Sequence, residues 1–237
     1  MEFMTGKTEK KTVLISDILS GEYEGKEVLL NGAVHKIRDM GEVAFVVLRT
    51  REGLVQTVYE EGTTTPELKE LCEEAAVTVK GTVALEERAP QGFEIRAVSF
   101  EILSKPVEPM PIAINKWKMN TSLETKLDLR PLSLRNVKER AKFRVQEGIV
   151  RGFRDYLHSQ GFTEIHTPKI GAKSAEGGAN LFKLQYFHRP AVLAQSPQFY
   201  KQMMVGVFDR VFETGPVFRA EKHNTKRHLN EYTSLDF

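Results

Sequence analysis

The sequence has little of what several classes of protein require. A single cysteine, Cys72, among 237 residues excludes a disulfide framework and a cysteine-based zinc site. The longest clean apolar run, residues 43–48, is far too short to span a bilayer. The first eleven residues are polar and basic and lack the apolar centre of a secretory signal. The sequence therefore predicts a cytoplasmic protein with no membrane segment.

Net charge is also small, at +2, although 28% of the residues are charged. The charges are unevenly distributed: residues 51–101 hold 5 basic and 11 acidic residues, whereas residues 105–155 hold 12 basic and 6 acidic ones. This contrast predicts two units with different partners. The basic stretch is compatible with nucleic-acid binding, but charge alone favours a solvated helix face. With 41% hydrophobic residues, the chain can still form a core.

The first half is typical of short strands separated by Gly, Asp and Pro. The expected strands are residues 27–34, 43–48, 54–59, 77–85 and 93–103, with a short helix over residues 66–74 between the third and fourth. Five strands with a helix after the third are typical of an OB-fold barrel, whose surface binds oligonucleotides. Other small five-stranded barrels share this pattern. We predict an OB-fold domain over residues 13–104.

The next segment, residues 105–135, contains Pro106, Pro109 and Pro111 and is predicted to be a linker or hinge. A second domain over residues 136–237 begins with a helix. Asn136 is a suitable N-cap with Glu139 three residues later, and Gly161 is a suitable stop. Apolar residues recur every four positions, namely Val137, Ala141, Val145, Ile149, Phe153 and Leu157. The pattern predicts a long amphipathic helix with one packed face.

The last 27 residues predict a polar hairpin. Residues 211–221 form the first expected strand, residues 222–227 the loop and residues 228–237 the returning strand. Strand periodicity places Arg219 and Glu221 on one face. On the returning strand it groups His228, Asn230, Tyr232, Ser234 and Asp236. A guanidinium, carboxylates and an aromatic ring suit a nucleotide. The alternative is a solvent-exposed face with ion pairs.

Two further segments carry candidate binding residues. Ser196 followed by Pro197 predicts a helix start, after which Gln198 and Lys201 are neighbours on one helix face. A lysine beside an amide near a helix N-terminus could hold a carboxylate ligand, although an ordinary cap with surface residues gives the same pattern. Glu176 lies in a glycine-bearing loop and could be a lid residue or part of the surface.

These segments resemble a known family. Residues 218–221 and 227–232 resemble motif 2 of class II aminoacyl-tRNA synthetases, and residues 161–168 resemble motif 1, which ends at Pro168. Residues 195–202 are similar to the aspartate-recognition segment of aspartyl-tRNA synthetases. Residues 219–221 and the following loop, residues 223–225, are similar to those of the archaeal-type aspartyl enzyme. The resemblance implies a mixed β and α+β protein, in which an OB-fold barrel precedes an antiparallel-sheet catalytic domain. It also implies a homodimer, with Pro168 at the interface.

The resemblance implies roles for the hairpin and helix residues. Arg219 would be catalytic and bind the α-phosphate of ATP, where charge develops. Glu221 would contact the nucleotide or the tRNA end, His228 the outer phosphates, and Tyr232 the adenine. The family usually has Phe at the position of Tyr232. In the aspartate pocket, Lys201 would bind the side-chain carboxylate, while Gln198, Asp236 and Glu176 would serve the ammonium group.

In the first domain, the resemblance implies an anticodon-binding surface. Phe45 would stack on the central base, Gln56 would read its edge and Arg38 would contact the neighbourhood. His35 occupies a position that influences whether tRNA(Asn) is accepted in addition to tRNA(Asp). The resemblance favours such relaxed recognition. The expected partners are therefore aspartate, ATP and tRNA(Asp), and relaxed recognition would add tRNA(Asn).

The sequence contains no segment that resembles motif 3, which carries an arginine for the ATP γ-phosphate. We therefore expect the N-terminal portion of an aspartate–tRNA ligase that lacks activity alone. The alternative is a non-catalytic OB-fold fragment that binds a tRNA anticodon. Mg²⁺ is expected to accompany ATP, and no metal ligand is predicted among these residues.

Overall fold

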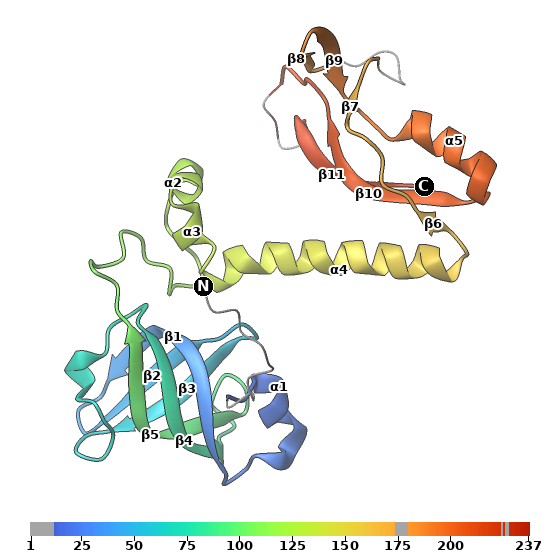
Figure 1. The fold of residues 1–237 in the computed structure, drawn as a ribbon. Helices are drawn as coiled ribbons and strands as arrows, with labels where there is room; N and C mark the ends of the chain where they lie inside the picture. The colour runs from blue at the N-terminus through green and yellow to red at the C-terminus, as the bar shows by residue number, and fades with distance from the viewer. Residues whose placement is uncertain (1–11, 174–179, 224, 226–227) are drawn as a thin grey trace, which may run out of the picture. The chain divides into compact units, whose positions relative to one another are not determined.

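The computed structural model describes residues 12–173, 180–223, 225 and 228–237. The chain divides into two compact units, with the boundary between Arg140 and Ala141 (Figure 1). The limits predicted for the linker and for the two domains stay a prediction. In the part that the structure describes, no helix has the length and apolar character needed to cross a membrane.

The first unit contains a closed five-stranded barrel. Its strands are β1 (Glu27–Asp39), β2 (Val43–Arg49), β3 (Leu54–Glu60), β4 (Ala76–Leu85) and β5 (Phe93–Ser104). They are hydrogen-bonded in the order β1-β2-β3-β5-β4, and the β3–β5 pair is parallel. All five predicted strands are present, and several extend beyond the predicted ends. This closed order confirms the OB-fold prediction.

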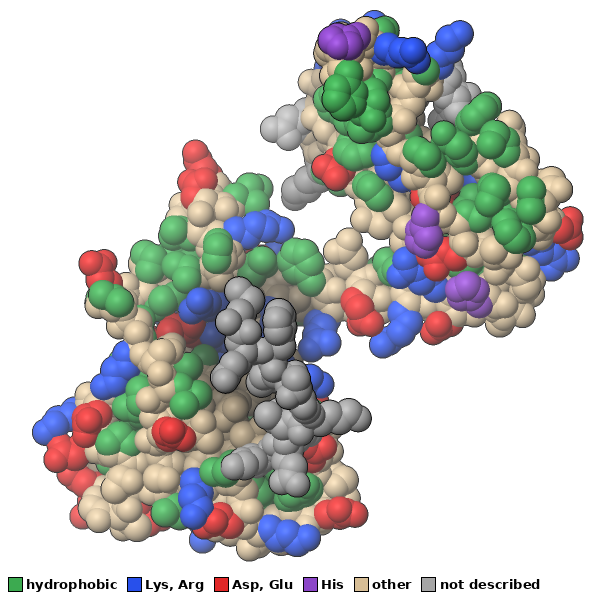
Figure 2. Space-filling view, viewed as in Figure 1, with side chains coloured by type: hydrophobic (Ala, Val, Ile, Leu, Met, Phe, Trp, Pro, Cys, Tyr) green, Lys and Arg blue, Asp and Glu red, His purple; other side chains and the backbone are tan. Residues whose placement is uncertain are grey.

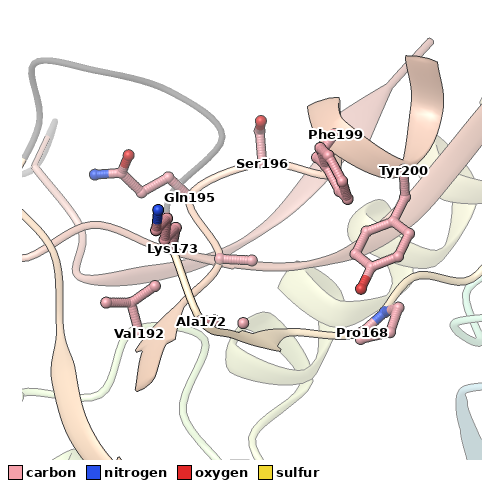
Figure 3. Close-up of a pocket in the computed structure, with 10 residues that line it drawn as sticks. Pro168, Ala172, Lys173, Val192, Gln195, Ser196, Phe199 and Tyr200 are labelled. Carbon is pink, nitrogen blue, oxygen red and sulfur yellow. The ribbon is translucent and has the colours of Figure 1, made fainter. Parts of the chain in front are cut away.

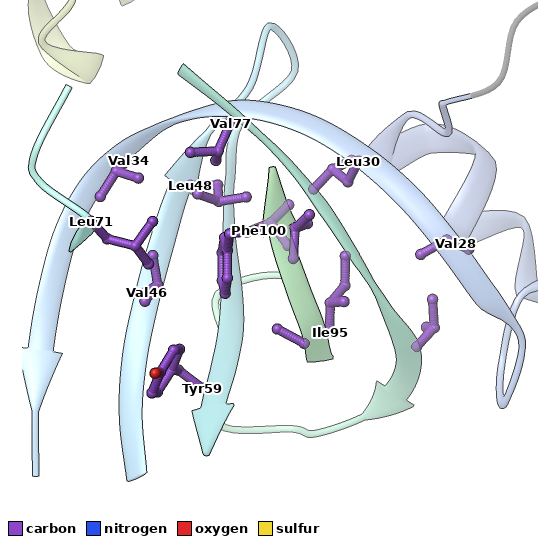
Figure 4. Packing of buried hydrophobic residues seen from close by; sticks show 14 of the residues in the cluster. Val28, Leu30, Val34, Val46, Leu48, Tyr59, Leu71, Val77, Ile95 and Phe100 are labelled. Carbon is purple, nitrogen blue, oxygen red and sulfur yellow. The ribbon is translucent and has the colours of Figure 1, made fainter. Parts of the chain in front are cut away.

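Alternation along the strands fills the barrel. Successive strand residues point to opposite faces, so every second side chain enters the interior. The fully buried side chains include Leu30, Val34, Val46, Leu48, Val55, Val77, Val79 and Ile95 (Figure 4). At Gly81 the register of β4 against β5 shifts, and a Cβ there would lie 2.3 Å from the Arg96 carbonyl oxygen. Glycine is therefore required where the two backbones approach.

Short helical segments flank the barrel. The turn α1 (Ile15–Asp17) and the π-helical turn η1 (Ile18–Glu22) were not predicted. The helix expected over residues 66–74 is wrong in extent, because only η2 (Leu68–Glu70) is helical, as a 3₁₀ turn. The backbone becomes extended at Leu71. Two more helices, α2 (Leu123–Asp128) and α3 (Arg130–Ser133), lie within residues 105–135.

The long helix α4 (Val137–Ser159) confirms the predicted amphipathic helix. The Oδ1 of Asn136 accepts hydrogen bonds from the N–H groups of Lys138 and Glu139, at 3.0 and 3.1 Å. The same side chain is buried and donates through Nδ2 to the carbonyls of Ile114 and Lys116, at 2.8 and 2.7 Å. Asn136 therefore caps the helix and anchors the preceding segment. Gly161 follows the helix with φ +77°.

The described residues of the second unit form two small sheets. One has the order β11-β10-β6 and comprises β6 (Thr163–Glu164), β10 (Val211–Phe218) and β11 (Glu231–Asp236). Its β10–β11 pair is antiparallel and its β10–β6 pair parallel. The other has the order β7-β9-β8, with β7 (Ile170–Gly171), β8 (Lys183–Tyr186) and β9 (Arg189–Leu193). Helix α5 (Gln198–Phe208) precedes β10.

The hairpin strands are shorter than predicted. The first ends at Phe218 rather than 221, and the second begins at Glu231 rather than 228. The N–H of Arg219 still donates to the Asn230 carbonyl, but that of Ala220 donates to the Asn180 carbonyl. The backbone hydrogen bonds therefore leave the hairpin ladder at Ala220, and strand periodicity does not relate Arg219 to Glu221.

Only part of the predicted α4 face is packed within the second unit. Leu157 is buried, and the Phe153 ring meets the Phe212 ring edge-on, with 5.7 Å between centroids. Val145 and Ile149 are exposed, although the four-residue spacing predicts them to be packed. Among the described residues, their side chains line a shallow groove with Thr233 and Leu235.

Candidate substrate and nucleic-acid binding sites

One face of β11 gathers residues of the predicted nucleotide site. Tyr232, Ser234 and Asp236 alternate with Thr233 and Leu235, and the first three are half-buried whereas the other two are exposed. The predicted common face is therefore present for these three residues. His228 precedes the strand, and its Nδ1 lies 2.7 Å from the Thr225 hydroxyl. The prediction that His228 shares the face through regular strand structure is wrong.

Arg219 lies beside this face. Its Cζ is 5.7 Å from the centroid of the Tyr232 ring, a cation–π arrangement across the two strands. Its Nε is buried and, among the described residues, has no hydrogen-bond partner. Such an unsatisfied donor is costly unless something accepts from it. The half-buried Glu221 is held through its backbone, since its N–H donates to the Asn230 Oδ1 at 3.0 Å.

The other end of the face holds an ion pair. The Nζ of Lys201, from α5, donates to the Oδ1 of Asp236, from β11. The two side chains are 13% and 21% exposed, so solvent screens the pair only partly. Lys201 also donates to the Phe237 carbonyl at 3.3 Å. The fold thus brings together two predicted aspartate-binding residues that are 35 positions apart in the chain.

Gln198 is the first residue of α5. The predicted start is one residue early, because Pro197 is the N-cap, and the Ser196 hydroxyl accepts from the Gln198 N–H at 3.2 Å. Gln198 and Lys201 line a cavity of about 300 Å³ together with Gln202, Val205, Val211 and Phe237. Helical spacing therefore places the amide and the ammonium at one cavity, as predicted. Glu176, the fourth predicted aspartate-binding residue, lies outside the described residues.

A larger cavity of about 490 Å³ lies elsewhere in the second unit (Figure 3). Pro168 and Tyr200 lie at one end and Val192 at the other. Its remaining lining residues are Gly171, Ala172, Lys173, Ala194, Gln195, Ser196 and Phe199. Of the predicted site residues only Pro168 lines it, so this cavity is not the predicted aspartate pocket.

The strand that follows Pro168 is fixed by a buried carboxylate that the sequence did not reveal. Glu213, on β10, accepts from the N–H and the hydroxyl of Thr167 at 2.9 and 2.7 Å. It also accepts from the Lys169 Nζ at 2.8 Å. Three hydrogen bonds satisfy a buried charge that would otherwise be costly. Glu213 therefore binds both neighbours of Pro168, Thr167 through its backbone and hydroxyl and Lys169 through its side chain.

On the barrel, three predicted anticodon-binding residues form one group. The Arg38 guanidinium lies 5.5 Å from the centroid of the Phe45 ring and donates to the Gln56 Oε1 at 3.0 Å. Gln56 in turn donates to the buried Glu94 carboxylate at 3.1 Å. Arg38 and Phe45 are directly opposite in the β1–β2 pairing. The group offers an aromatic face, a cation and an oriented amide, which suit a single-stranded base. Glu94 was not predicted.

His35 has different neighbours. The β1–β2 register shifts between Val34 and Lys36, so His35 occupies a β-bulge. Its Nδ1 is 3.5 Å from the Arg49 Nη1, and Arg49 forms two hydrogen bonds with Glu74, at 2.5 and 2.8 Å. Burial and the Arg49 charge lower the pKa of His35 below its usual value, which favours the neutral imidazole.

Glu74 joins the barrel to the segment before α4. Besides Arg49, it accepts from the Arg135 Nη1 at 2.9 Å. Burial alone would raise the pKa of Glu74, but the hydrogen bonds and charges of Arg49 and Arg135 outweigh it and lower the pKa. His35 and Glu74 line a second cavity of about 490 Å³, whose other lining residues include Val107, Met110 and Ile114. His35 thus faces this segment, and its neighbours are not the Arg38 group.

No group of three or more His, Cys, Asp or Glu side chains suited to a metal ion occurs among the described residues.

Comparison with known proteins defines the class. Residues 122–237 match the family model of class II tRNA synthetases (D, K and N), and residues 28–103 match that of the OB-fold nucleic-acid-binding (anticodon) domain. The chain belongs to the class II tRNA synthetases of this group. The fold prediction, an OB-fold barrel followed by a class II synthetase sheet region, is thereby confirmed.

Individual relatives within this class narrow the similarity to one kind of ligase. The chain is 50% identical over 215 residues to an aspartate–tRNA(Asp/Asn) ligase of Deinococcus radiodurans, covering 91% of this chain and 48% of the relative. It is 48% identical to the ligase of the same name from Thermus thermophilus, covering 94% and 51%. The chain therefore spans about half the length of the curated relatives that it matches.

Solved structures agree with the fold. The asparaginyl-tRNA synthetase of Pyrococcus horikoshii complexed with asparaginyl-adenylate superposes with a TM-score of 0.80 at 35% identity, covering 90% of this chain and 50% of that one. The aspartyl-tRNA synthetase of Entamoeba histolytica gives 0.73 at 32% identity, covering 97% and 50%.

Proposed function

We propose that this chain is part of an aspartate–tRNA ligase, which activates aspartate with ATP and transfers it to tRNA. The observation that carries the proposal is the composition of the β11 face. Lys201 and Asp236 form an oppositely charged pair at one end, and Arg219 lies over Tyr232 at the other. From 232 to 236 the strand rises about 14 Å. This length accommodates an amino acid beside a nucleotide.

The amino-acid end suits aspartate. The Lys201 ammonium would bind the side-chain carboxylate, and Asp236 would bind the α-ammonium group. Gln198, beside Lys201 at the same cavity, would serve the ammonium group as well, as would Glu176. The side-chain carboxylate and the α-ammonium group of the ligand then each meet an opposite charge, which a partly desolvated site requires.

The nucleotide end suits ATP. Arg219 would stabilise the charge that develops at the α-phosphate when the aspartate carboxylate attacks it, and its buried Nε has the free donor for this task. Tyr232 would stack on adenine, His228 would approach the outer phosphates and Glu221 would contact the nucleotide or the tRNA end. Mg²⁺ would accompany ATP and neutralise its phosphates.

The barrel would bind the tRNA anticodon. Phe45 would stack on the central base, Gln56 would read its edge, and Arg38 would contact the neighbourhood. His35 would influence recognition of tRNA(Asn) from behind this surface, through the bulge in β1. We further propose a cytoplasmic homodimer with Pro168 at its interface.

The test uses the polypeptide encoded by the whole reading frame that contains these 237 residues. Aspartate-dependent ATP–pyrophosphate exchange is expected, with asparagine and lysine as comparison substrates. Charging of purified tRNA(Asp) and tRNA(Asn) at similar rates would support relaxed recognition. Exchange that depends on asparagine or lysine rather than aspartate would refute the proposal, and a strict preference for tRNA(Asp) would refute relaxed recognition alone.

A second candidate function, a non-catalytic anticodon binder, is favoured by the closed barrel and its Arg38, Phe45 and Gln56 group. It predicts that the 237-residue chain binds an anticodon stem-loop while the whole reading frame shows no exchange with any amino acid.

A further inference from the structure

The hairpin formed by β8 and β9 ends in an unusual turn. Tyr186 pairs with Arg189, so the loop consists of only Phe187 and His188. Phe187 adopts φ +52°, a region that tight hairpins normally fill with Gly, Asn or Asp. A bulky aromatic residue there is a local violation of turn chemistry. Such violations cluster at functional sites.

The tip exposes two aromatic rings. Phe187 is 79% exposed and Tyr186 49%, and their ring centroids are 4.9 Å apart with the planes nearly perpendicular. The Gln185 side-chain amide donates to the Phe187 carbonyl at 2.9 Å and braces the turn. Large apolar groups held in solvent by a braced turn point to a ligand rather than to a core.

The charged side chains of the hairpin itself are all basic. Residues 180–208 contain no Asp or Glu, whereas Lys183 and Arg189 are exposed on the hairpin and His188 is in its loop. Figure 2 shows basic, histidine and hydrophobic side chains gathered where β8 and β9 lie in Figure 1. Aromatic rings interleaved with cations are the pattern that binds single-stranded nucleic acid. A symmetric contact with a second copy would instead bring like charges together.

The base of the hairpin is hydrogen-bonded next to Arg219. The N–H of Phe218 donates to the Ala194 carbonyl at 2.9 Å, and that of Ala220 to the Asn180 carbonyl at 3.0 Å. Asn180 precedes β8 and Ala194 follows β9, so these two bonds flank Arg219 on both sides. From Ala194 to Arg189 the extended chain spans about 17 Å. The tip therefore lies within a few nucleotides of the proposed reaction site.

We propose that the hairpin tip, residues 183–189, binds the single-stranded 3′ end of the RNA substrate. Tyr186 and Phe187 offer ring faces to bases, and Lys183 and Arg189 bind phosphates. This inference rests on the proposed function for the identity of the RNA, while its chemistry rests on the hairpin alone.

The test measures binding of the 237-residue chain to two RNA duplexes by fluorescence anisotropy. One has a four-nucleotide single-stranded 3′ overhang and the other is blunt. The wild-type chain is expected to favour the overhang. Phe187→Gly removes the ring and suits the positive φ, so it should preserve the hairpin while lowering affinity for the overhang about tenfold. Tyr156→Ala, at an exposed ring of α4, is the matched control and should leave the affinity unchanged.

Arg189→Gln should lower the dependence of log affinity on log salt by about one unit, because one phosphate contact is lost. Equal wild-type affinity for the two duplexes, or an unchanged affinity in Phe187→Gly, would overturn the inference. A dimer in sedimentation that Phe187→Gly converts to monomer would assign the tip to a second copy and also overturn it.

The outcome is separable from that of the proposed function. Overhang binding that depends on Phe187, in a protein whose whole reading frame charges no tRNA, would retain the inference and refute the function. Normal charging kinetics in the Phe187→Gly variant would refute the inference and retain the proposed function.

Discussion

Replacing Glu74 by Gln tests the ionic contact that fastens the segment before α4 to the barrel. The Glu74 side chain is 3% exposed and that of its main partner, Arg49, is 9% exposed. Gln has nearly the same shape and tolerates the positive φ of this position about as well. It removes the charge and leaves only one oxygen that can accept hydrogen bonds.

The expected loss follows from burial. Removing one partner of a buried ion pair costs about 3–5 kcal/mol, because the other charge stays buried and unpaired. Arg135 is 45% exposed, so its bond to Glu74 contributes only about 0.2–1 kcal/mol. Because the Gln oxygen retains one bond to Arg49, we expect Glu74→Gln to lower the unfolding free energy by about 3 kcal/mol. Arg135→Gln should cost no more than about 1 kcal/mol.

Urea unfolding followed by the fluorescence of Trp117 gives the measurement. This residue is the single tryptophan, and it belongs to the same unit as Glu74. Glu101→Gln, at an exposed site of β5, is the matched control and should change stability by less than about 0.5 kcal/mol. A loss in Glu74→Gln no larger than in Arg135→Gln would refute the assignment of a buried, charge-dependent contact.

The ion pair of Glu74 and Arg49 also predicts that stability depends on pH. Although burial raises the pKa of Glu74, the bonds and charges of Arg49 and Arg135 outweigh it, so the folded pKa is below the unfolded one. Stabilisation from the pair is then fully present above the unfolded pKa, about 4.3. It is lost as the pH falls through the folded pKa. The stability difference between wild type and Glu74→Gln should therefore be constant between about pH 5 and 7 and shrink in more acidic solution. A stability difference that grows as the pH falls would contradict the lowered pKa of Glu74 in the folded protein.

The remaining predictions concern other parts of the chain. Phe45→Ala should lower affinity for an anticodon stem-loop about tenfold in anisotropy titrations, and an unchanged affinity would exclude stacking at this ring. In the protein from the whole reading frame, Lys201→Met should raise the KM for aspartate at least about tenfold and reduce the preference over asparagine in pyrophosphate exchange. A retained preference would show that selection lies elsewhere. Gly81→Ala should destabilise the barrel by about 1–3 kcal/mol through backbone overlap. Gly148→Ala, with open space around it in α4, should stabilise by up to about 1 kcal/mol, and thermal unfolding in the opposite order would contradict both.

Much of the barrel could be predicted because its signals are local. Strand β2 was expected over residues 43–48 and ends at Arg49. The turn before it contains Gly41 at φ +97°, with its N–H bonded to the Asp39 carboxylate. Between such turns every second side chain of the strand enters the core, as those of Ala44, Val46 and Leu48 do, so the register has little freedom. The N-cap of α4 was equally local, since Asn136 bonds to residues two and three positions later.

The contacts that were not predicted join residues far apart in the chain. Arg49 and Arg135 lie 25 and 61 positions from Glu74, and Glu213 lies 46 positions from Thr167. No spacing rule relates such pairs, because their meeting depends on the closed barrel and on a strand pairing. The bulge at His35 has the same origin, since a register shift exists only between two strands. At the hairpin, periodicity failed beyond Phe218 because Asn180 takes over the backbone pairing.

Because Lys201 and Asp236 form an ion pair, an amino acid that binds in the proposed site must exchange its own charged groups for that contact. Without a ligand the two side chains already neutralise each other, so an amino acid must replace a contact rather than simply add one. Aspartate can replace both, with its carboxylate on Lys201 and its ammonium on Asp236. Asparagine can supply only the ammonium group for Asp236. Its neutral amide would leave Lys201, whose side chain is 13% exposed, without a counter-charge. An uncompensated buried charge costs on the order of several kcal/mol. Rejection of asparagine would therefore depend on the burial of Lys201 more than on any contact that aspartate gains.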